Sequence, residues 1–250
     1  MARERKLKLS VIVPALKRDE LYEAEVASVD AAAKRCADLA VETILVEGVK
    51  PVGAARNRGI ARATGDYFWF VDGDDLVHPE SLRVIEEAIA SCGHPDIVEF
   101  AYAKFADAFE PVAIPDPPPV RVYDLTERRD HVAAYKGVAQ WLLGSTGVFR
   151  RGLVEGMAFE LMPNGEDSLW GMRAFYQAKN LVHVDLPLYG YRQRADSAKH
   201  TMSREHYRSI RTVFFRLVVE GLRVPHLRCA VLRKIPSILH DLIRMRSRVS

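Results

Sequence analysis

The stretch Tyr67-Phe-Trp-Phe-Val-Asp72-Gly-Asp74-Asp75 decides the fold class of this 250-residue chain. Five consecutive apolar or aromatic residues are typical of a strand that is buried on both faces of a sheet. Three carboxylates follow it, and open α/β sheets bind ligands at the carboxyl ends of their strands. Two aspartates separated by one glycine can bind a divalent cation that also holds phosphate oxygens. The structural alternative is an acidic turn that caps the next helix.

Strand-like and helix-like segments alternate on both sides of this stretch, which predicts an α/β fold with a mostly parallel sheet flanked by helices. Pro79 suits the first position of a helix. Five of the nine residues 111–119 are proline, which predicts a loop. The expected strands are 9–13, 43–46, 67–71, 97–100 and 181–186, and the expected helices include 19–38, 53–63 and 164–178.

The composition is that of a globular protein, with 48% hydrophobic and 28% charged residues. No apolar run approaches the roughly 18 residues that a membrane-spanning helix needs. The apolar run 11–16 contains Pro14 and leads into Lys17, so we do not expect a signal peptide. The three cysteines are far apart and form no CxxC pair. A disulfide scaffold or zinc site is therefore not expected, and a cytoplasmic location is.

The charge is unevenly distributed along the chain. The formal net charge is +3, but residues 204–250 contain eleven Lys and Arg against three acids. We therefore expect two parts, a catalytic domain at 1–200 and a basic helical C-terminal extension at 201–250. Its helices either pack on the domain with their arginines in water, or lie on an anionic membrane surface. Nucleic acid is not an expected partner, because no recognisable reading module accompanies the basic residues.

Four blocks of the sequence resemble family 2 glycosyltransferases, which have the Rossmann-type GT-A fold. The longest is Ala54-Ala-Arg-Asn-Arg-Gly-Ile-Ala-Arg-Ala-Thr-Gly-Asp-Tyr-Phe-Trp-Phe-Val-Asp-Gly-Asp-Asp75. It is similar to the family's Ala-Arg-Asn helix, its Ala-x-Gly-(Asp/Glu)-Tyr turn and its Asp-x-Asp-Asp strand end. The other three blocks are Leu9–Pro14, similar to the first strand; Phe149-Arg-Arg-Gly-Leu with Phe159 and Gly165-Glu-Asp167, similar to the acceptor-side block; and Leu188-Tyr-Gly-Tyr-Arg-Gln-Arg-Ala-Asp-Ser197, similar to the closing stretch.

The resemblance implies a role for each residue of the acidic motif. Asp72 would lie near the sugar-nucleotide ribose or the metal. Asp74 would be the principal ligand of Mn²⁺ or Mg²⁺, which holds the diphosphate. Asp75 would cap or orient. Arg56 would support the diphosphate or the acidic loop.

The resemblance also places a general base at Glu166-Asp167, and we prefer Asp167. An inverting transfer needs a carboxylate on the face opposite the departing nucleotide. The structural alternative is a capping motif in which Asn164 is the N-cap.

Further residues are expected to contact the nucleotide sugar. The resemblance adds Pro14, and Glu47 could accept a hydrogen bond from a uracil or guanine edge. Arg192 and Arg194 suit phosphate, and His200 could add a metal or diphosphate contact. The alternative for the last three is a charged surface loop.

The chain departs from the family pattern after its first two strands. It has Leu16-Lys17-Arg18 and Glu47-Gly-Val-Lys50 where many members have Tyr-Asn and Asp-Asp-Gly-Ser-x-Asp. Arg56 follows Glu47 by nine residues, so one strand of the family is expected to be missing.

We therefore expect a metal-dependent inverting transferase of polysaccharide biosynthesis, working in the cytoplasm at the inner face of the membrane. The donor would be a nucleoside-diphosphate sugar, with UDP favoured. The acceptor would be a glycan, a lipid-linked saccharide or a small molecule. One alternative is a degenerate protein that binds a sugar nucleotide without turnover. The other is a haloacid-dehalogenase-like phosphatase, which expects Thr or Val where this chain has Leu76.

Overall fold

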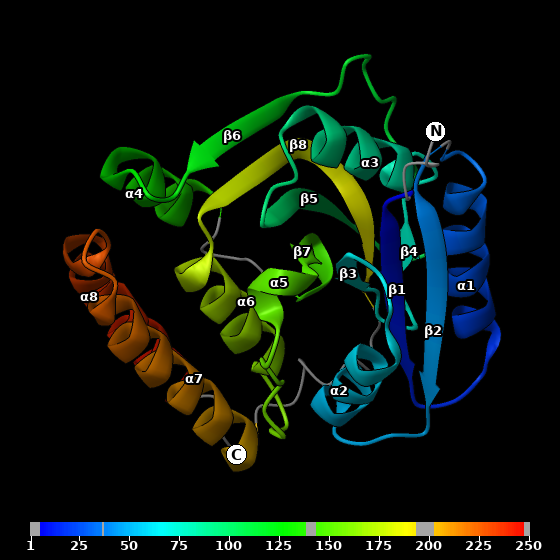
Figure 1. Cartoon of the computed structure of the whole chain (residues 1–250). Coiled ribbons are helices and arrows are strands. Elements are labelled where there is room, and N and C mark those ends of the chain that lie inside the picture. Colours follow the sequence, from blue (N-terminus) through cyan, green and yellow to red (C-terminus); the bar gives the residue numbers. More distant parts are fainter. Residues whose placement is uncertain (1–5, 37, 139–143, 194–202, 248–250) are drawn as a thin grey trace.

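The computed structural model describes residues 6–36, 38–138, 144–193 and 203–247. Within them, one eight-stranded sheet lies between layers of helices (Figure 1). Its order is β2-β1-β3-β7-β5-β8-β4, and β6 pairs with β8 off this path. The strands are β1 (Lys8–Ala15), β2 (Ala40–Glu47), β3 (Tyr67–Phe70), β4 (Leu76–Val77), β5 (Ile97–Phe105), β6 (Val120–Asp124), β7 (Gly147–Arg150) and β8 (Asn180–Arg192).

The sheet is mixed, and its two longest ladders are parallel. They join β1 to β2 and β5 to β8, while β7 lies antiparallel between β3 and β5. The prediction of a mostly parallel α/β sheet is thus confirmed. Because β1 is parallel to both β2 and β3, the carboxyl ends of these three strands lie at one edge of the sheet. Glu47, the last residue of β2, and the acidic residues after β3 therefore lie at the same edge of the sheet, with the end of β1 between them.

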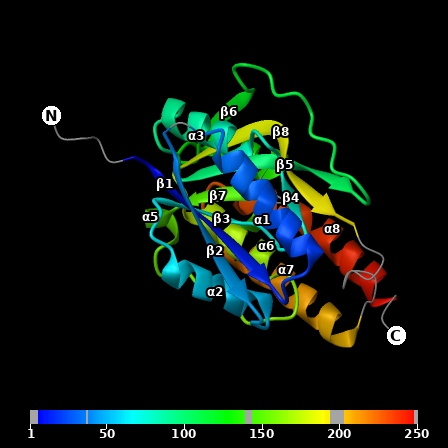
Figure 2. The same ribbon diagram turned by 90° about the vertical axis from the view of Figure 1, so that its right-hand side faces the viewer.

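Helices cover both faces of the sheet (Figures 1 and 2). One apolar cluster joins α1 and α3 to one face. A second cluster joins α2, α4, α6 and α8 to the other face. The helices are α1 (Glu20–Ala33), α2 (Val52–Arg62), α3 (Ser81–Ser91), α4 (Arg128–Gly137), α5 (Arg151–Val154), α6 (Glu166–Gln177), α7 (Arg204–Arg223) and α8 (Arg228–Arg246).

Strand β3 is buried on both faces, as its unbroken apolar sequence predicts. Tyr67 and Trp69 point into one apolar cluster, and Phe68 and Phe70 into the other. None of the four is more than 2% exposed. This alternation follows from the two-residue period of a strand. It holds the acidic residues that come next on a rigid central element.

The C-terminal extension is helical, as expected, and one side of it packs on the domain. Arg173 of α6 forms an ion pair with Glu220 of α7. The Tyr176 hydroxyl donates a hydrogen bond to the Leu217 carbonyl (3.1 Å). Leu227 and Val231, at most 1% exposed, join the apolar cluster under the sheet. The expected boundary near residue 200 lies outside the described residues. In the part of the chain that is described, no helix has the length and apolarity needed to span a membrane.

The structure corrects some of the expected element boundaries. Pro79 is not the first residue of a helix, because Glu80 is the N-cap of α3 with non-helical backbone angles. Strand β4 was not predicted, since two residues are too short for a periodic pattern. Strand β8 runs well past residue 186, because it pairs with β5, β6 and β4 along its length.

Candidate active site

The acidic turn after β3 lies against the end of β1. Its backbone closes through a hydrogen bond from Asp75 N to the Asp72 carbonyl (3.0 Å). Gly73 N donates to the carbonyl of the buried Pro14 (3.3 Å). A Cβ atom on Gly73 would lie 3.0 Å from the Ala15 Cβ and 3.1 Å from the Pro14 oxygen. A side chain here would have to displace Ala15 or Pro14 by a few tenths of an ångström, so this close approach favours glycine, and Pro14 contacts the turn through its backbone.

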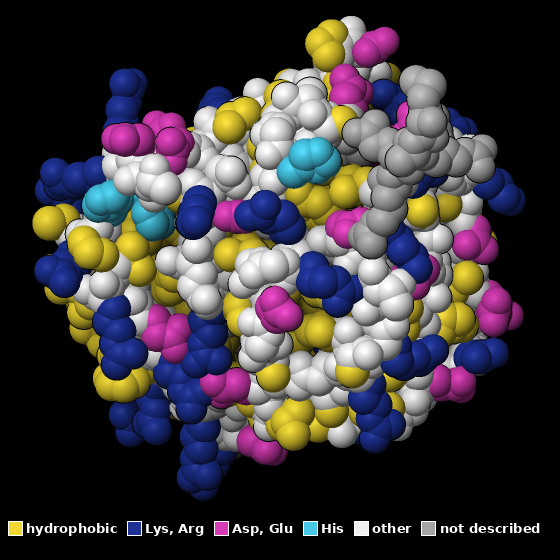
Figure 3. Space-filling model, in the orientation of Figure 1, with side chains coloured by type: hydrophobic (Ala, Val, Ile, Leu, Met, Phe, Trp, Pro, Cys, Tyr) yellow, Lys and Arg dark blue, Asp and Glu magenta, His cyan; other side chains and the backbone are white. Residues whose placement is uncertain are grey.

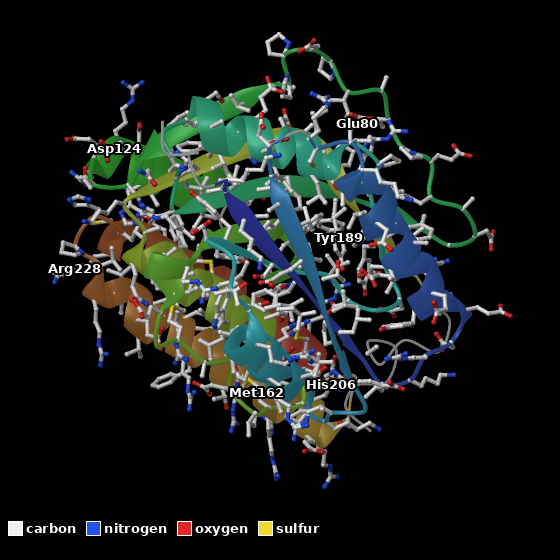
Figure 4. All side chains as sticks on the ribbon, turned by 45° about the vertical axis from the view of Figure 1, so that its right-hand side comes forward. Glu80, Asp124, Met162, Tyr189, His206 and Arg228 are labelled. Carbon is white, nitrogen blue, oxygen red and sulfur yellow. The ribbon has the colours of Figure 1, made fainter. Side chains whose placement is uncertain are left out.

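Asp75 anchors the acidic turn to β8. Its side chain is buried and accepts hydrogen bonds from the Tyr189 hydroxyl (2.6 Å) and from Arg192 N (2.7 Å). Burial, together with the charges of Asp72 and Asp74, raises the pKa of Asp75 to about 8. The Tyr189 hydroxyl also accepts from Asp72 N (3.2 Å). Tyr189 lies inside the fold (Figure 4), where it joins both ends of the turn.

Arg192 lies beside the same turn. Its Nε donates to the Asp74 carbonyl (2.8 Å), and its guanidinium lies 4.5 Å from the centre of the Phe105 ring. With Asp75 held by β8, the half-buried side chains of Asp72 and Asp74 are the carboxylates of the turn nearest to solvent.

Arg56 of α2 connects the acidic turn to the Glu166-Asp167 segment. Its Nη2 donates to Asp72 Oδ1 (2.7 Å), and its Nη1 donates to Glu166 Oε1 (2.6 Å). The Arg56 side chain is 3% exposed and Glu166 is 6% exposed, whereas Asp72 is 33% exposed. Burial lowers the pKa of Arg56, but the carboxylates of Asp72, Glu166 and Asp167 outweigh it and raise the pKa above its ordinary value. Of the two roles expected for Arg56, the structure describes contact with the acidic loop.

Asn57, the next residue of α2, holds the segment before α6. Its Nδ2 donates to the Phe159 carbonyl (2.9 Å), and its Oδ1 accepts from Phe159 N (2.8 Å). The Phe159 ring stacks on Trp170 of α6, with ring centres 4.7 Å apart. The Arg56 guanidinium lies 5.3 Å from the centre of the same Phe159 ring. Arg56 and Asn57 thus position the two halves of the site relative to each other.

Glu166 and Asp167 occupy the first turn of α6. Gly165 is the N-cap, with φ of 80°, so the alternative in which Asn164 caps the helix is wrong. Acidic residues are stabilised in a first turn by the helix dipole. Burial and the charge of Asp167 raise the pKa of Glu166, while Arg56 opposes this shift. Asp167 is half-buried, and its Oδ1 accepts a hydrogen bond from Ser168 N (2.7 Å).

The remaining residues that were predicted to contact the nucleotide sugar either lie apart from this cluster or fall outside the described part of the chain. Glu47, at the exposed end of β2, forms an ion pair with Arg18 (3.0 Å). Helix α2 begins five residues later, so no strand lies between β2 and α2 in this described segment. Arg194 and His200 lie outside the described residues. Among the residues that are described, no cluster of three His, Cys, Asp or Glu side chains could hold a metal ion.

Two residues of the site were missed by sequence reasoning. Tyr189 stood in the quoted closing stretch without an assigned role. Glu25 of α1 is 0% exposed, and its side-chain oxygens have no hydrogen-bond partner in the described structure. Burial, with the charges of Asp72 and other acids, raises its pKa to about 9. Its spacing on the buried face of α1, with Tyr22 and Val29, was the available signal.

Comparison with known proteins finds similarity to glycosyltransferases. The sequence model for Glycosyl transferase family 2 matches residues 26–107. EpsJ of Bacillus subtilis (strain 168), named as an uncharacterized glycosyltransferase, is 30% identical over 152 residues, which are 58% of this chain and 43% of EpsJ. Glycosyltransferase GlyA of Streptococcus pneumoniae serotype 4 is 24% identical over 197 residues, covering 75% of this chain and 28% of GlyA.

Solved structures agree on the fold. The crystal structure of S. aureus TarS 1-349 in complex with UDP-GlcNAc has a TM-score of 0.61 and 18% identity, and the match covers 96% of this chain and 72% of that one. The fold is therefore of the GT-A glycosyltransferase class. The resemblance stated above is confirmed, because the family 2 glycosyltransferase model matches residues 26–107 and the curated relatives are named as glycosyltransferases. It spans less than half the length of the curated relatives that it matches.

Proposed function

We propose that this chain transfers a sugar from a nucleoside-diphosphate sugar, with UDP favoured, to an acceptor hydroxyl with inversion. The observation that carries the proposal is the double hydrogen bond of buried Arg56 to Asp72 and Glu166. It joins the acidic turn to the Glu166-Asp167 turn at the carboxyl edge of the sheet, where α/β folds bind ligands. The matches to glycosyltransferases support this reaction over a phosphatase. The UDP-GlcNAc complex of TarS supports the choice of UDP.

The acidic turn suits a divalent cation. Asp72 and Asp74 offer hard carboxylate oxygens, which Mn²⁺ and Mg²⁺ prefer, and both side chains are half-buried, whereas Asp75 is buried against Tyr189 and Arg192. We assign Asp74 as the principal ligand and Asp72 as a ligand or ribose contact. A bound cation would supply positive charge where the diphosphate leaving group becomes more negative.

Side chains of the protein itself carry out the remaining steps of the reaction. The acceptor oxygen attacks the anomeric carbon, the bond from that carbon to the diphosphate breaks, and the hydroxyl proton moves to Asp167. We prefer Asp167 because Glu166 is buried against Arg56, while the Asp167 carboxylate reaches solvent. Arg192, beside Asp74, is positioned to contact the diphosphate. Glu47 would contact the nucleotide base. Arg194 would contact phosphate, and His200 would contact the metal or the diphosphate.

Other features of the structure support the proposed location of the protein and its contact with a membrane. All three cysteines are free thiols, which fits the expected cytoplasmic location. Helices α7 and α8 expose the large apolar side chains Phe215, Leu232, Leu239 and Ile243 among their arginines, which supports contact with the inner face of a membrane. The acceptor is a glycan, a lipid-linked saccharide or a small molecule, as in polysaccharide biosynthesis.

A thermal-shift screen tests the donor site. UDP, GDP, CDP and dTDP would each be added with and without Mn²⁺ to the parent, to Asp74→Ala and to the control Asp107→Ala, which removes an exposed acid elsewhere. A nucleotide at about 100 times its Kd adds roughly 2.7 kcal/mol of stability. We expect a Mn²⁺-dependent shift with UDP in the parent and the control, and none in Asp74→Ala.

The same screen weighs the non-catalytic alternative, which the short connection between β2 and α2 favours. A UDP shift without transfer to any acceptor would support a binding protein. No shift with any nucleotide would refute the proposed donor site.

A further inference from the structure

A basic cavity opens at the end of the α7–α8 hairpin where α7 begins and α8 ends. It has a volume of about 420 Å³ and is lined by Arg204, Tyr207, Arg208, Arg211 and Arg246. We call it the arginine cavity. The three arginines of α7 are spaced four and three residues apart, so they lie on one face of the helix. In Figure 3, Lys and Arg side chains gather at the lower left, over this hairpin.

The arginines of the cavity are not used to hold the fold together. All four are exposed, and the described residues provide none of their guanidinium groups with an ion pair or a hydrogen bond. The contrast on the same hairpin is Arg216, which forms an ion pair with Glu160. Like charges at this helical spacing are mutually unfavourable. An anion bound among them would remove that repulsion.

The geometry of the guanidinium group favours phosphate as the anion that the cavity binds. Its planar fork binds phosphate through paired hydrogen bonds, and four such groups converge on one volume. The Tyr207 side chain adds a hydroxyl group and an apolar ring. A single carboxylate would satisfy one of the four arginines, whereas phosphate diesters, diphosphates or clustered headgroups could contact several.

The helix that carries three of the cavity arginines also contacts the candidate active site. A Cβ atom on Gly165, the N-cap of α6, would lie 3.0 Å from Val213 of α7. Helix α7 therefore passes directly beside the turn that carries Asp167. Arg211 and Arg204 precede Val213 by two and nine residues, or about 3 and 14 Å along the helix axis. His206, labelled in Figure 4, marks this end of the hairpin, and Arg228 marks the other.

We propose that the arginine cavity binds phosphate groups, carried by a phosphorylated acceptor or by the headgroups of anionic lipid. Phosphate binding does not depend on the proposed transferase activity, but the assignment of the phosphate to an acceptor does. In that case a ligand held by its phosphate would have to pass around α7 to bring a sugar hydroxyl to Asp167, because the three α7 arginines project from the side of the helix away from Val213.

Binding of two probes to three proteins tests the proposal. The proteins are the parent, the cavity variant Arg208→Gln/Arg211→Gln, and the control Arg128→Gln/Arg129→Gln, which removes two exposed charges from α4. The soluble probe is inorganic tripolyphosphate, followed by titration calorimetry without divalent cations. The lipid probe is vesicles of phosphatidylcholine with 30% phosphatidylglycerol, compared in flotation with pure phosphatidylcholine vesicles.

We expect the cavity variant to lose at least about tenfold in affinity for one of the probes, because two charge-assisted contacts are removed. The control should change less than about threefold, since exposed charges at a distance are screened. Loss confined to tripolyphosphate identifies a soluble phosphorylated ligand, and loss confined to vesicles identifies a lipid headgroup.

Equal losses in the cavity variant and the control, or no binding of either probe by the parent, would overturn the proposal. A thermal shift with UDP and Mn²⁺ distinguishes failure of the arginine cavity from failure of the donor site. The cavity variant should keep that shift, because its substitutions lie outside the donor site. Phosphate binding in a protein that shows no shift with any nucleotide would refute the transferase proposal and leave the arginine cavity as a phosphate site.

Discussion

Replacing Arg56 by Met tests whether this residue holds the site together by charge. The variant removes the partner of Glu166, which is 6% exposed, and one partner of Asp72, which is 33% exposed. Breaking a buried ion pair by removing one partner costs about 3–5 kcal/mol, because a buried charge is left uncompensated. The more exposed Asp72 contact adds at most about 1 kcal/mol. We therefore expect a loss of about 4 kcal/mol from a typical total of 5–15 kcal/mol.

Urea unfolding measures this loss. With a denaturant slope near 3 kcal/mol per molar, the midpoint should fall by roughly 1.3 M. The loss should be smaller at pH 5 than at pH 8, because the unpaired Glu166 can then take up a proton and remain buried as a neutral acid. Adding Glu166→Gln should restore part of the stability of Arg56→Met, since the double variant leaves no buried charge at this position.

Two results would refute this reasoning. One is a loss below about 1 kcal/mol for Arg56→Met, which would make the contact equivalent to an exposed ion pair. The other is a loss that is the same at pH 5 and pH 8 and unaffected by Glu166→Gln. That result would mean that Arg56 acts through packing on Phe159 rather than through charge.

Three further predictions follow from the same geometry. In Glu25→Gln, stability in EDTA should fall less between pH 5 and pH 8 than in the parent. In the parent, folded Glu25 keeps its proton up to about pH 9, whereas unfolded Glu25 loses it near pH 4.5. The folded state therefore loses up to about 1.4 kcal/mol of stability per pH unit in this window. Urea-unfolding profiles of parent and variant that run parallel with pH would contradict this prediction. Asp167→Asn should keep the UDP and Mn²⁺ thermal shift and lose at least about 100-fold in transfer rate, whereas full activity would move the base elsewhere. Gly73→Ala should weaken UDP and Mn²⁺ binding in titrations while costing about 1–3 kcal/mol of stability, because its Cβ would press the turn away from β1; unchanged nucleotide affinity would show that the turn tolerates the shift.

Much of the fold could be predicted from residue patterns. The four aromatic residues of β3 are buried alternately on two faces, and an unbroken apolar run is the pattern that such a strand produces. A helix at Pro79 was predicted, but its first residue was not predicted correctly. Helix propensity does not separate Pro79 from Ser81 as the first residue, and in the structure the Glu80 amide donates instead to His78 Nδ1 (3.0 Å). The antiparallel position of β7 between β3 and β5 is likewise a long-range pairing without a local signal.

The residues of the candidate site could be predicted from the sequence, but the contacts between them could not. Glu166, Asp72 and Arg56 were each singled out, yet their pairing spans up to 110 residues of sequence and appears in no spacing rule. Asp75 was expected to cap or orient, and its bonds to Tyr189 and the backbone of Arg192 account for the second of these roles. Such contacts depend on the register of β8, which a single sequence does not define.

The position of helix α2 also explains how the domain can form with a short connection between β2 and α2. Arg56 and Asn57 bind the acidic turn on one side and the segment around Phe159 on the other. Neither contact involves residues 48–51, which connect β2 to α2. In the proposed transferase, the short connection would leave less protein beside the nucleotide base, whereas the alignment of Asp72 with Glu166 depends on Arg56 of α2. The two functions of the site are separable on this basis, because base selectivity would depend on the loop after Glu47, while the distance between donor and acceptor would depend on Arg56.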